Sequence, residues 1–255
     1  MRAYAAFTAK EFTEYTRTYK LLVIGLVFLL FGISSPLAAK FMPEIISQFM
    51  PAGIEITITE PAALDSWMQF LKNISQIGAF VLVILLSGIM AGEYSRGTLI
   101  HILTKGLSRK TVILSKFTAA ALLWTGAYLL CFGVAYGYTW YFWRKTVNTP
   151  GLAEAITALW VFGILLTAIT VLGGVLVRSS YGTLLFTGAL VVIQILLNML
   201  PDVQDYNPIQ LANGGTPLMQ GQLESGSLIK PMIVAAAGIA ICIIAACAAF
   251  NKKKL

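Results

Sequence analysis

The chain has 255 residues, of which 58% are hydrophobic and 11% are charged. A soluble domain carries about a quarter of its residues as charged ones, so this composition excludes an ordinary soluble protein and indicates a membrane protein. The formal net charge of +7 could suggest nucleic-acid binding, but the cations lie in loops and at the chain ends rather than along one basic face. The three cysteines lie in apolar runs without a CxxC pair, so we interpret them as small core residues.

Residues 1–20 are predicted to form an amphipathic helix at the membrane interface. At about 100° per residue, its aromatic side chains fall on one side and its cations gather on the opposite side. The aromatic set is Tyr4, Phe7, Phe12, Tyr15 and Tyr19, and the cationic set is Arg2, Lys10, Arg17 and Lys20. This separation is typical of a helix that lies in the headgroup region with its cations toward anionic lipid. The alternative is a frayed basic tail that only sets the orientation of the chain.

Six apolar runs follow, each close to the roughly 20 residues that an α-helix needs to cross a bilayer. They are predicted at 21–39, 77–94, 111–138, 155–177, 181–200 and 232–250. An aromatic cluster at 136–143 is typical of the interfacial end of a span. The sequence therefore predicts an all-α polytopic membrane protein, built as a single transmembrane domain over residues 1–255.

Two longer segments, 40–76 and 201–231, are predicted to be external loops. In the first, residues 54–59 alternate like a short strand, and a second part carries an apolar stripe at helical spacing. The stripe consists of Trp67, Phe70, Leu71 and Ile74. We expect the segment 40–76 to lie against the membrane surface, because it is too small to bury a core of its own.

The distribution of Lys and Arg predicts the orientation of the chain. Six spans place both chain ends on one side of the membrane. The opposite side would carry only Lys40, Lys72, Arg144, Lys145 and Lys230, and the other 13 of the 18 cations would lie with the chain ends. Because Lys and Arg accumulate in short cytoplasmic loops, both termini are expected to face the cytoplasm.

The connector at 95–110, between the second and third predicted spans, belongs to the most basic interior part of the chain. A short amphipathic helix is expected inside it, with Leu99, Ile102 and Leu103 at helical spacing. On another face of this helix, His101 and Lys105 form an i,i+4 pair. Gly106 supplies a stop for the helix, and Ser108 is a plausible cap for the next one.

The sequence contains no motif that would give the chain its own energy source or catalytic centre. It has no GxxxxGK[ST] phosphate-binding loop, no HExxH and no GxSxG. His101 lacks a companion at metal-ligand spacing, so we interpret it as an ordinary polar residue. Apart from Glu93, at the end of the second run, no charge lies deep in a predicted span, which argues against a transporter driven by an ion gradient. No catalytic residue, metal ion or cofactor is expected in this chain.

Two amides stand out in the fifth predicted span. Gln194 and Asn198 are four residues apart, so both face one direction. Amide side chains are costly in lipid, and we expect these two to face protein or a central cavity. Hydrogen bonding between helices and contact with a transported substrate remain open as interpretations.

A short motif joins the end of the second span to the connector. Residues 92–99 read Gly-Glu-Tyr-Ser-Arg-Gly-Thr-Leu, residues 103–109 read Leu-Thr-Lys-Gly-Leu-Ser-Arg, and Lys116-Phe117 follows. With the N-terminal helix and the six spans, this resembles the permease subunit of ABC-2 type exporters. In that family Glu-x-x-x-Gly-Thr ends the second span, and Pro-x-x-Arg and Gly-Lys usually follow. Here Gly106 stands where a proline is common, and Ser115 stands where a glycine is frequent.

The resemblance implies that 95–105 is a coupling helix, which docks in a groove of a separate ATP-binding subunit. The residues it implicates are Glu93, Arg96, Leu99, Ile102, Leu103 and Lys105. The three apolar side chains would anchor the helix, with Arg96 and Lys105 at the rim. Glu93 would hold the connector against the N-terminal helix through Arg17 or Lys20. The alternative is that the apolar side chains rest on the bilayer surface.

The resemblance also implies a complex in the bacterial cytoplasmic membrane. Two copies of a P-loop ATPase would bind ATP and Mg, and a second permease copy or a sister permease would complete the path. The permease itself would not be an enzyme. An apolar lining favours an amphiphilic cargo, such as a peptide antibiotic or a lipid. The alternative is a non-transporting assembly or signalling protein, whose connector binds another cytosolic partner.

Overall fold

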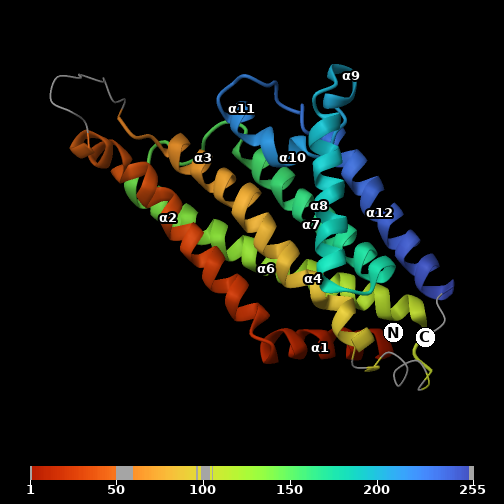
Figure 1. Cartoon of the computed structure of the whole chain (residues 1–255). Coiled ribbons are helices and arrows are strands. Elements are labelled where there is room, and N and C mark those ends of the chain that lie inside the picture. Colours follow the sequence, from red (N-terminus) through yellow and green to blue (C-terminus); the bar gives the residue numbers. More distant parts are fainter. Residues whose placement is uncertain (1, 50–59, 96, 99–103, 105, 253–255) are drawn as a thin grey trace.

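Long α-helices make up most of the chain, as its apolar runs predict. The computed structural model describes residues 2–49, 60–95, 97–98, 104 and 106–252. Figure 1 shows the long helices side by side, most of them with a similar tilt, while α1 (Arg2–Arg17) lies across one end of them. We call this end of the molecule the α1 end. The last described residues of α12 (Ile229–Lys252) lie at the same end.

Within the described part of the chain, six helical stretches are long and apolar enough to cross a membrane, which confirms the predicted architecture. They are Lys20–Met42, Ala63–Ser95, Arg109–Phe142, Leu152–Val177, Ser180–Leu197 and Ile229–Lys252. The elements that form them besides α12 are α2 (Lys20–Phe49), α3 (Ala63–Asn73), the π-helical turn η1 (Ile74–Gly78), α4 (Ala79–Ser95), α6 (Arg109–Phe142), α7 (Leu152–Val177) and α8 (Ser180–Leu197). The segment predicted as the loop 201–231 contains three short helices, which are α9 (Pro201–Gln204), α10 (Gln210–Asn213) and α11 (Gly215–Met219).

The start of α6 follows from its sequence. The Ser108 hydroxyl accepts a hydrogen bond from the backbone N–H of Thr111 at 3.1 Å, so Ser108 is the N-cap, as predicted. Two residues earlier, Gly106 has a φ of +87°, a left-handed conformation that glycine adopts without steric cost. In the same way, the Ser179 hydroxyl caps α8 by accepting from the N–H of Gly182 at 3.1 Å.

The second span begins earlier than the sequence predicts. It starts at Ala63 rather than at 77, because α3, η1 and α4 follow one another without a break. The stripe predicted to lie on the membrane surface is buried in the protein instead. The ring of Trp67 lies 5.8 Å from that of Phe132 on α6, and the ring of Phe70 lies 5.9 Å from that of Tyr128. The strand predicted at 54–59 lies outside the described residues.

Helix α7 lies in the core of the bundle, in contact with α4, α6, α8 and α12. Its Gly163 allows the indole ring of Trp124 on α6 to approach its backbone closely. The ring is held in place by a 3.0 Å hydrogen bond from its Nε1 to the carbonyl of Trp160. In contrast, α8 and α12 expose long apolar faces, as expected of helices that contact lipid or another protein.

Helix α1 packs against the bundle through part of its predicted aromatic face. Phe7 and Tyr15 are buried, and the Tyr4 hydroxyl is 2.6 Å from the Thr118 hydroxyl on α6. Tyr19 is exposed and has a φ of +57° in the turn between α1 and α2. Some of the aromatic side chains assigned to lipid therefore contact protein, and the interfacial position of α1 stays a prediction.

Candidate functional site

Charged side chains from three helices meet at the α1 end, beside the start of the connector. We call Lys10, Glu11, Glu14, Glu93 and Lys116 the ionic cluster. Helix α1 supplies the first three of these residues, the last turn of α4 supplies Glu93, and the third turn of α6 supplies Lys116. The cluster thus joins segments that are far apart in the sequence.

Lys116 is the buried centre of the cluster, with 1% of its side chain exposed. Its ammonium group donates hydrogen bonds to both carboxylate oxygens of Glu11 at 2.9 Å and to Oε1 of Glu93 at 3.2 Å. Three acceptors therefore take the three N–H groups of the lysine. A buried charge is tolerated only when it is paired and hydrogen-bonded in this way.

Lys10 closes the cluster on its exposed side. Its ammonium group lies 2.5 Å from Oε1 of Glu93, 2.8 Å from Oε2 of Glu14 and 3.1 Å from Oε1 of Glu11. Burial alone would lower the pKa of Lys10, but the hydrogen bonds to Glu14 and Glu93 and the charge of Glu11 raise that pKa above its usual value. Lys10 consequently stays charged over the whole physiological pH range.

The cluster also reaches the first turn of the connector. The Thr98 hydroxyl donates a hydrogen bond to Oε2 of Glu93, so both carboxylate oxygens of Glu93 have partners. Gly97, just before this threonine, has a φ of +65° and lets the chain turn away from α4. The beginning of the connector is thus tied to α1 and α6 by one carboxylate.

The arrangement of carboxylates has the geometry of a cation site, but lysines satisfy it. One oxygen from each of Glu11, Glu14 and Glu93 lies within 4.8 Å of the others. The ammonium groups of Lys10 and Lys116 bind these same carboxylates at hydrogen-bond distance. We therefore interpret the cluster as a structural junction, because its negative charges are already compensated.

The cluster corrects one expectation about Glu93. The resemblance placed Glu93 against the N-terminal helix, and the structure places it there, but through Lys10 and Lys116. The expected partners Arg17 and Lys20 were wrong, because the middle of α1 lies beside Glu93 rather than its C-terminal end. Sequence reasoning did not place Lys10, Glu11, Glu14 or Lys116 at this junction. A lysine within an otherwise apolar run of α6 is a signal that could have revealed Lys116.

The other residues implicated in coupling are Arg96, Leu99, Ile102, Leu103 and Lys105, and they lie outside the described residues. Their roles as anchors and rim therefore stay predictions. What the structure adds is the geometry on either side of them. Thr98 is bonded to Glu93, and Gly106 turns the chain back toward the cap of α6 at Ser108.

The two amides of the fifth span lie at the far end of α8 from the α1 end. Oε1 of Gln194 and Oδ1 of Asn198 are inaccessible to solvent and have no hydrogen-bond partner within the described part of the chain. Asn207 donates a 2.6 Å hydrogen bond to the backbone carbonyl of Gln194. The side-chain oxygens thus make no bond to another helix in the described chain, and both interpretations of these amides stay open.

Comparisons with known proteins agree with the family suggested by the motif. A family model described as "ABC-2 family transporter protein" matches residues 5–255. The chain is also similar to "Uncharacterized transmembrane protein YxlG" from Bacillus subtilis (strain 168), with 23% identity over 186 residues, which is 70% of each protein. The chain therefore belongs to the ABC-2 family of transporter proteins, as a multi-pass permease component of an ABC transporter.

Proposed function

We propose that this permease forms the translocation path of an exporter and that a separate P-loop ATPase moves it by binding the connector. The observation that carries the proposal is the ionic cluster, which fastens the first turn of the connector to α1 and α6. A connector fixed in this way moves together with those helices rather than independently of them. The ATPase would bind ATP and Mg, so hydrolysis would occur in the partner.

The continuous helix Ala63–Ser95 would carry a movement of the connector to the opposite end of the molecule. Its 33 residues span about 50 Å at 1.5 Å per residue, which exceeds the roughly 40–45 Å thickness of a bilayer with its headgroups. A displacement at Glu93 would therefore tilt one rod that reaches the other surface. Rigid-body movement of this kind switches a bundle between inward-open and outward-open states.

A second permease, either another copy or a sister chain, would complete the path. Helix α8 supports this because its apolar side chains are widely exposed on the outside of the bundle. A facing subunit would cover this apolar surface by close helix packing. We propose two permeases and two ATPase subunits in a bacterial cytoplasmic membrane, with both termini of the permease in the cytoplasm.

The cargo is proposed to be an amphiphile such as a peptide antibiotic or a lipid. A second candidate function is a non-transporting assembly or signalling protein, in which the connector binds a different cytosolic partner. The two candidate functions differ in the protein that should co-purify with the permease, since only the transporter requires a P-loop ATPase.

Replacing Leu103 with aspartate is expected to abolish recovery of a P-loop ATPase when the tagged permease is purified from membranes of its host. A charge at an apolar anchor would have to be buried unpaired in the docking groove. His101→Asp is the matched control, because it adds the same charge to another face of the connector. The measurement is the amount of ATPase recovered by mass spectrometry. Equal recovery with both variants would contradict docking through this face, and recovery of a different partner would favour the second function.

A further inference from the structure

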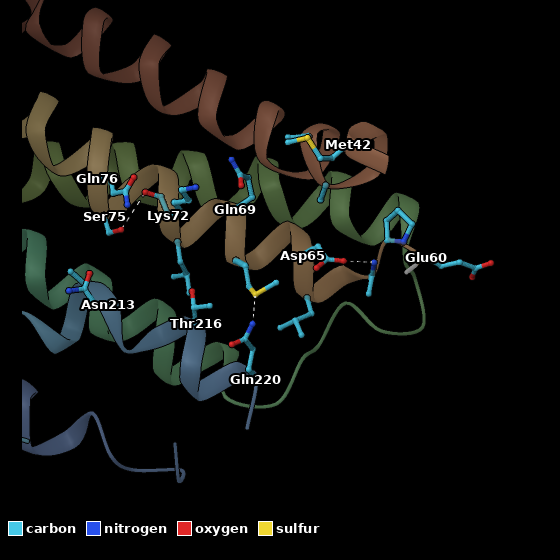
Figure 2. A pocket seen from close by; sticks show the side chains of 18 residues that line it. Met42, Glu60, Asp65, Gln69, Lys72, Ser75, Gln76, Asn213, Thr216 and Gln220 are labelled. Carbon is cyan, nitrogen blue, oxygen red and sulfur yellow. Dashed lines mark hydrogen bonds between the residues drawn. The ribbon is translucent and has the colours of Figure 1, made fainter. Parts of the chain in front are cut away.

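Two adjoining cavities lie toward the end of the bundle opposite the α1 end. The first has a volume of about 820 Å³ and lies between α2, α3, α10 and α11 (Figure 2). The second has a volume of about 740 Å³ and lies between α4, α7 and α8. Both volumes fall in the range of ligand pockets, roughly 300–1,000 Å³. Four residues line both cavities, namely Ser75, Gln76, Ala212 and Asn213, so the two form one groove.

The side chains that line this groove change from polar to apolar along one helix face. Asp65, Gln69, Lys72 and Gln76 recur at helical spacing along α3 and η1, and all four line the first cavity. Beyond η1 the lining side chains become apolar, beginning with Ala79 and Phe80. The change from polar to apolar falls at a π-helical turn, a feature that is frequent at functional sites.

The polar groups occur in a definite sequence from the outside inward. Along α3 and η1 the carboxylate of Asp65 comes first, Lys72 follows two turns later and Gln76 one turn after that, and Asn213 of α10 also lines the cavity. Figure 2 shows Lys72, Ser75 and Gln76 along one segment and Asn213 and Thr216 on the other. A phosphoethanolamine lipid has the complementary order, with an ammonium group outermost, then a phosphate, then glycerol esters and acyl chains.

We propose that this groove binds one zwitterionic aminophospholipid from the leaflet opposite α1. Its ammonium group lies at Asp65, its phosphate at Lys72, its ester groups at Gln76 and Asn213, and one acyl chain in the second cavity. The inference deepens the proposal of an amphiphilic cargo. It rests on that proposed function only for the step from binding to transport.

The groups assigned to the headgroup are available for a ligand. The side chains of Lys72, Gln76 and Asn213 make no hydrogen bond or ion pair to any part of the chain that the structure describes. Oδ2 of Asp65 accepts from the N–H of Ala62 at 2.9 Å, which leaves Oδ1 for an ammonium group. Each polar group thus has an unused bond of the type that the headgroup requires.

The second cavity is suited to an acyl chain and opens toward lipid. Phe162 and Leu166 of α7 form part of one wall, and Leu185 and Val192 of α8 form part of another. The last two side chains are 73% and 53% exposed, so the cavity borders the outer surface of the bundle. A lipid can enter from the bilayer sideways without passing its chain through water. A fully polar solute would leave this cavity unfilled.

The test is native mass spectrometry of the detergent-purified permease, without ATPase, titrated with phosphatidylethanolamine. One bound lipid is expected per chain. Gly188→Trp should abolish it, since Gly188 lines the apolar cavity and open space lies where its side chain would begin. Gly126→Trp is the matched control, because it adds the same ring in open space on α6, outside either cavity. Should Gly188→Trp fail to fold, Val192→Trp fills the same cavity from its exposed side.

A second set of variants tests which residues bind the lipid headgroup. Lys72→Met should weaken binding about tenfold, as expected for loss of one charge-assisted bond to phosphate, while Lys145→Met should leave it unchanged. Phosphatidylglycerol, which lacks the ammonium group, should bind more weakly than phosphatidylethanolamine. The proposal would be overturned if Gly188→Trp bound as much lipid as Gly126→Trp, or if Lys72→Met bound it as tightly as Lys145→Met. Equal binding of phosphatidylglycerol and phosphatidylethanolamine would overturn it as well. If no P-loop ATPase is recovered even with the unmodified permease, the proposed function fails, but these lipid-binding results are unaffected.

Discussion

Replacing Lys116 with methionine is expected to lower the free energy of unfolding by about 3–5 kcal/mol, the typical cost of removing one partner from a buried ion pair. The substitution leaves Glu11 buried without the ammonium group that binds both of its oxygens, and it removes one of the two lysines at Glu93. The measurement is the unfolding transition of the purified protein in detergent, obtained by titration with denaturant.

Two further variants separate the charge from the packing. Lys110→Met removes an exposed lysine at the start of the same helix and should change stability by less than about 0.5 kcal/mol. Combining Lys116→Met with Glu11→Met removes the unpaired carboxylate and should regain part of the lost stability. If Lys116→Met unfolds at the same denaturant concentration as Lys110→Met, the cluster does not hold α1 to the bundle.

A second large effect is expected from Gly163→Ala in the core. The added methyl group would overlap the indole ring of Trp124. That ring cannot move freely, because its Nε1 is bonded to the carbonyl of Trp160 and it packs edge-on against Phe28 at 5.6 Å. Overpacking of this kind typically costs about 1–3 kcal/mol. The thermal unfolding temperature in detergent, compared with wild type, measures the effect.

The control for this prediction is Gly126→Ala in α6. Outside its own stretch of helix, no atom of the described chain lies within 4 Å of the position of its added methyl group, and alanine is favoured over glycine in a helix interior by up to about 1 kcal/mol. The two glycine-to-alanine changes are therefore expected to shift stability in opposite directions. A lower unfolding temperature for Gly126→Ala than for Gly163→Ala would contradict the close approach of α6 and α7.

The number of spans could be predicted because each apolar run is long enough to be recognised as a membrane-crossing helix. The start of the second span could not, since one face of α3 carries Asp65, Gln69 and Lys72 and lowers its hydropathy. Sequence alone does not reveal that this polar face lines a cavity while the opposite face packs on the aromatic rings of α6. The stripe at Trp67 was recognised as helical, but its partner in the core was not.

The candidate site was predicted in part for a similar reason. Glu93 was identified because it is a carboxylate at the end of an apolar run. Its partner Lys116 is 23 residues away, and Lys116 binds Glu11 at a separation of 105 residues. Pairings over such distances depend on how α1 crosses α6, which neither periodicity nor composition specifies. Ser108 and Gly106 could be predicted, because caps and turns depend on neighbouring residues alone.

The connector must lie in the cytoplasm if a separate ATPase is to bind it. The direct test is a cysteine at Ile100, placed in a chain whose Cys131, Cys242 and Cys247 are replaced by alanine. A membrane-impermeant maleimide should label this cysteine in inside-out vesicles and leave it unlabelled in intact cells. Ser225→Cys, in the loop at the opposite end, should show the reverse pattern. Labelling of residue 100 in intact cells would place the connector outside and contradict the account.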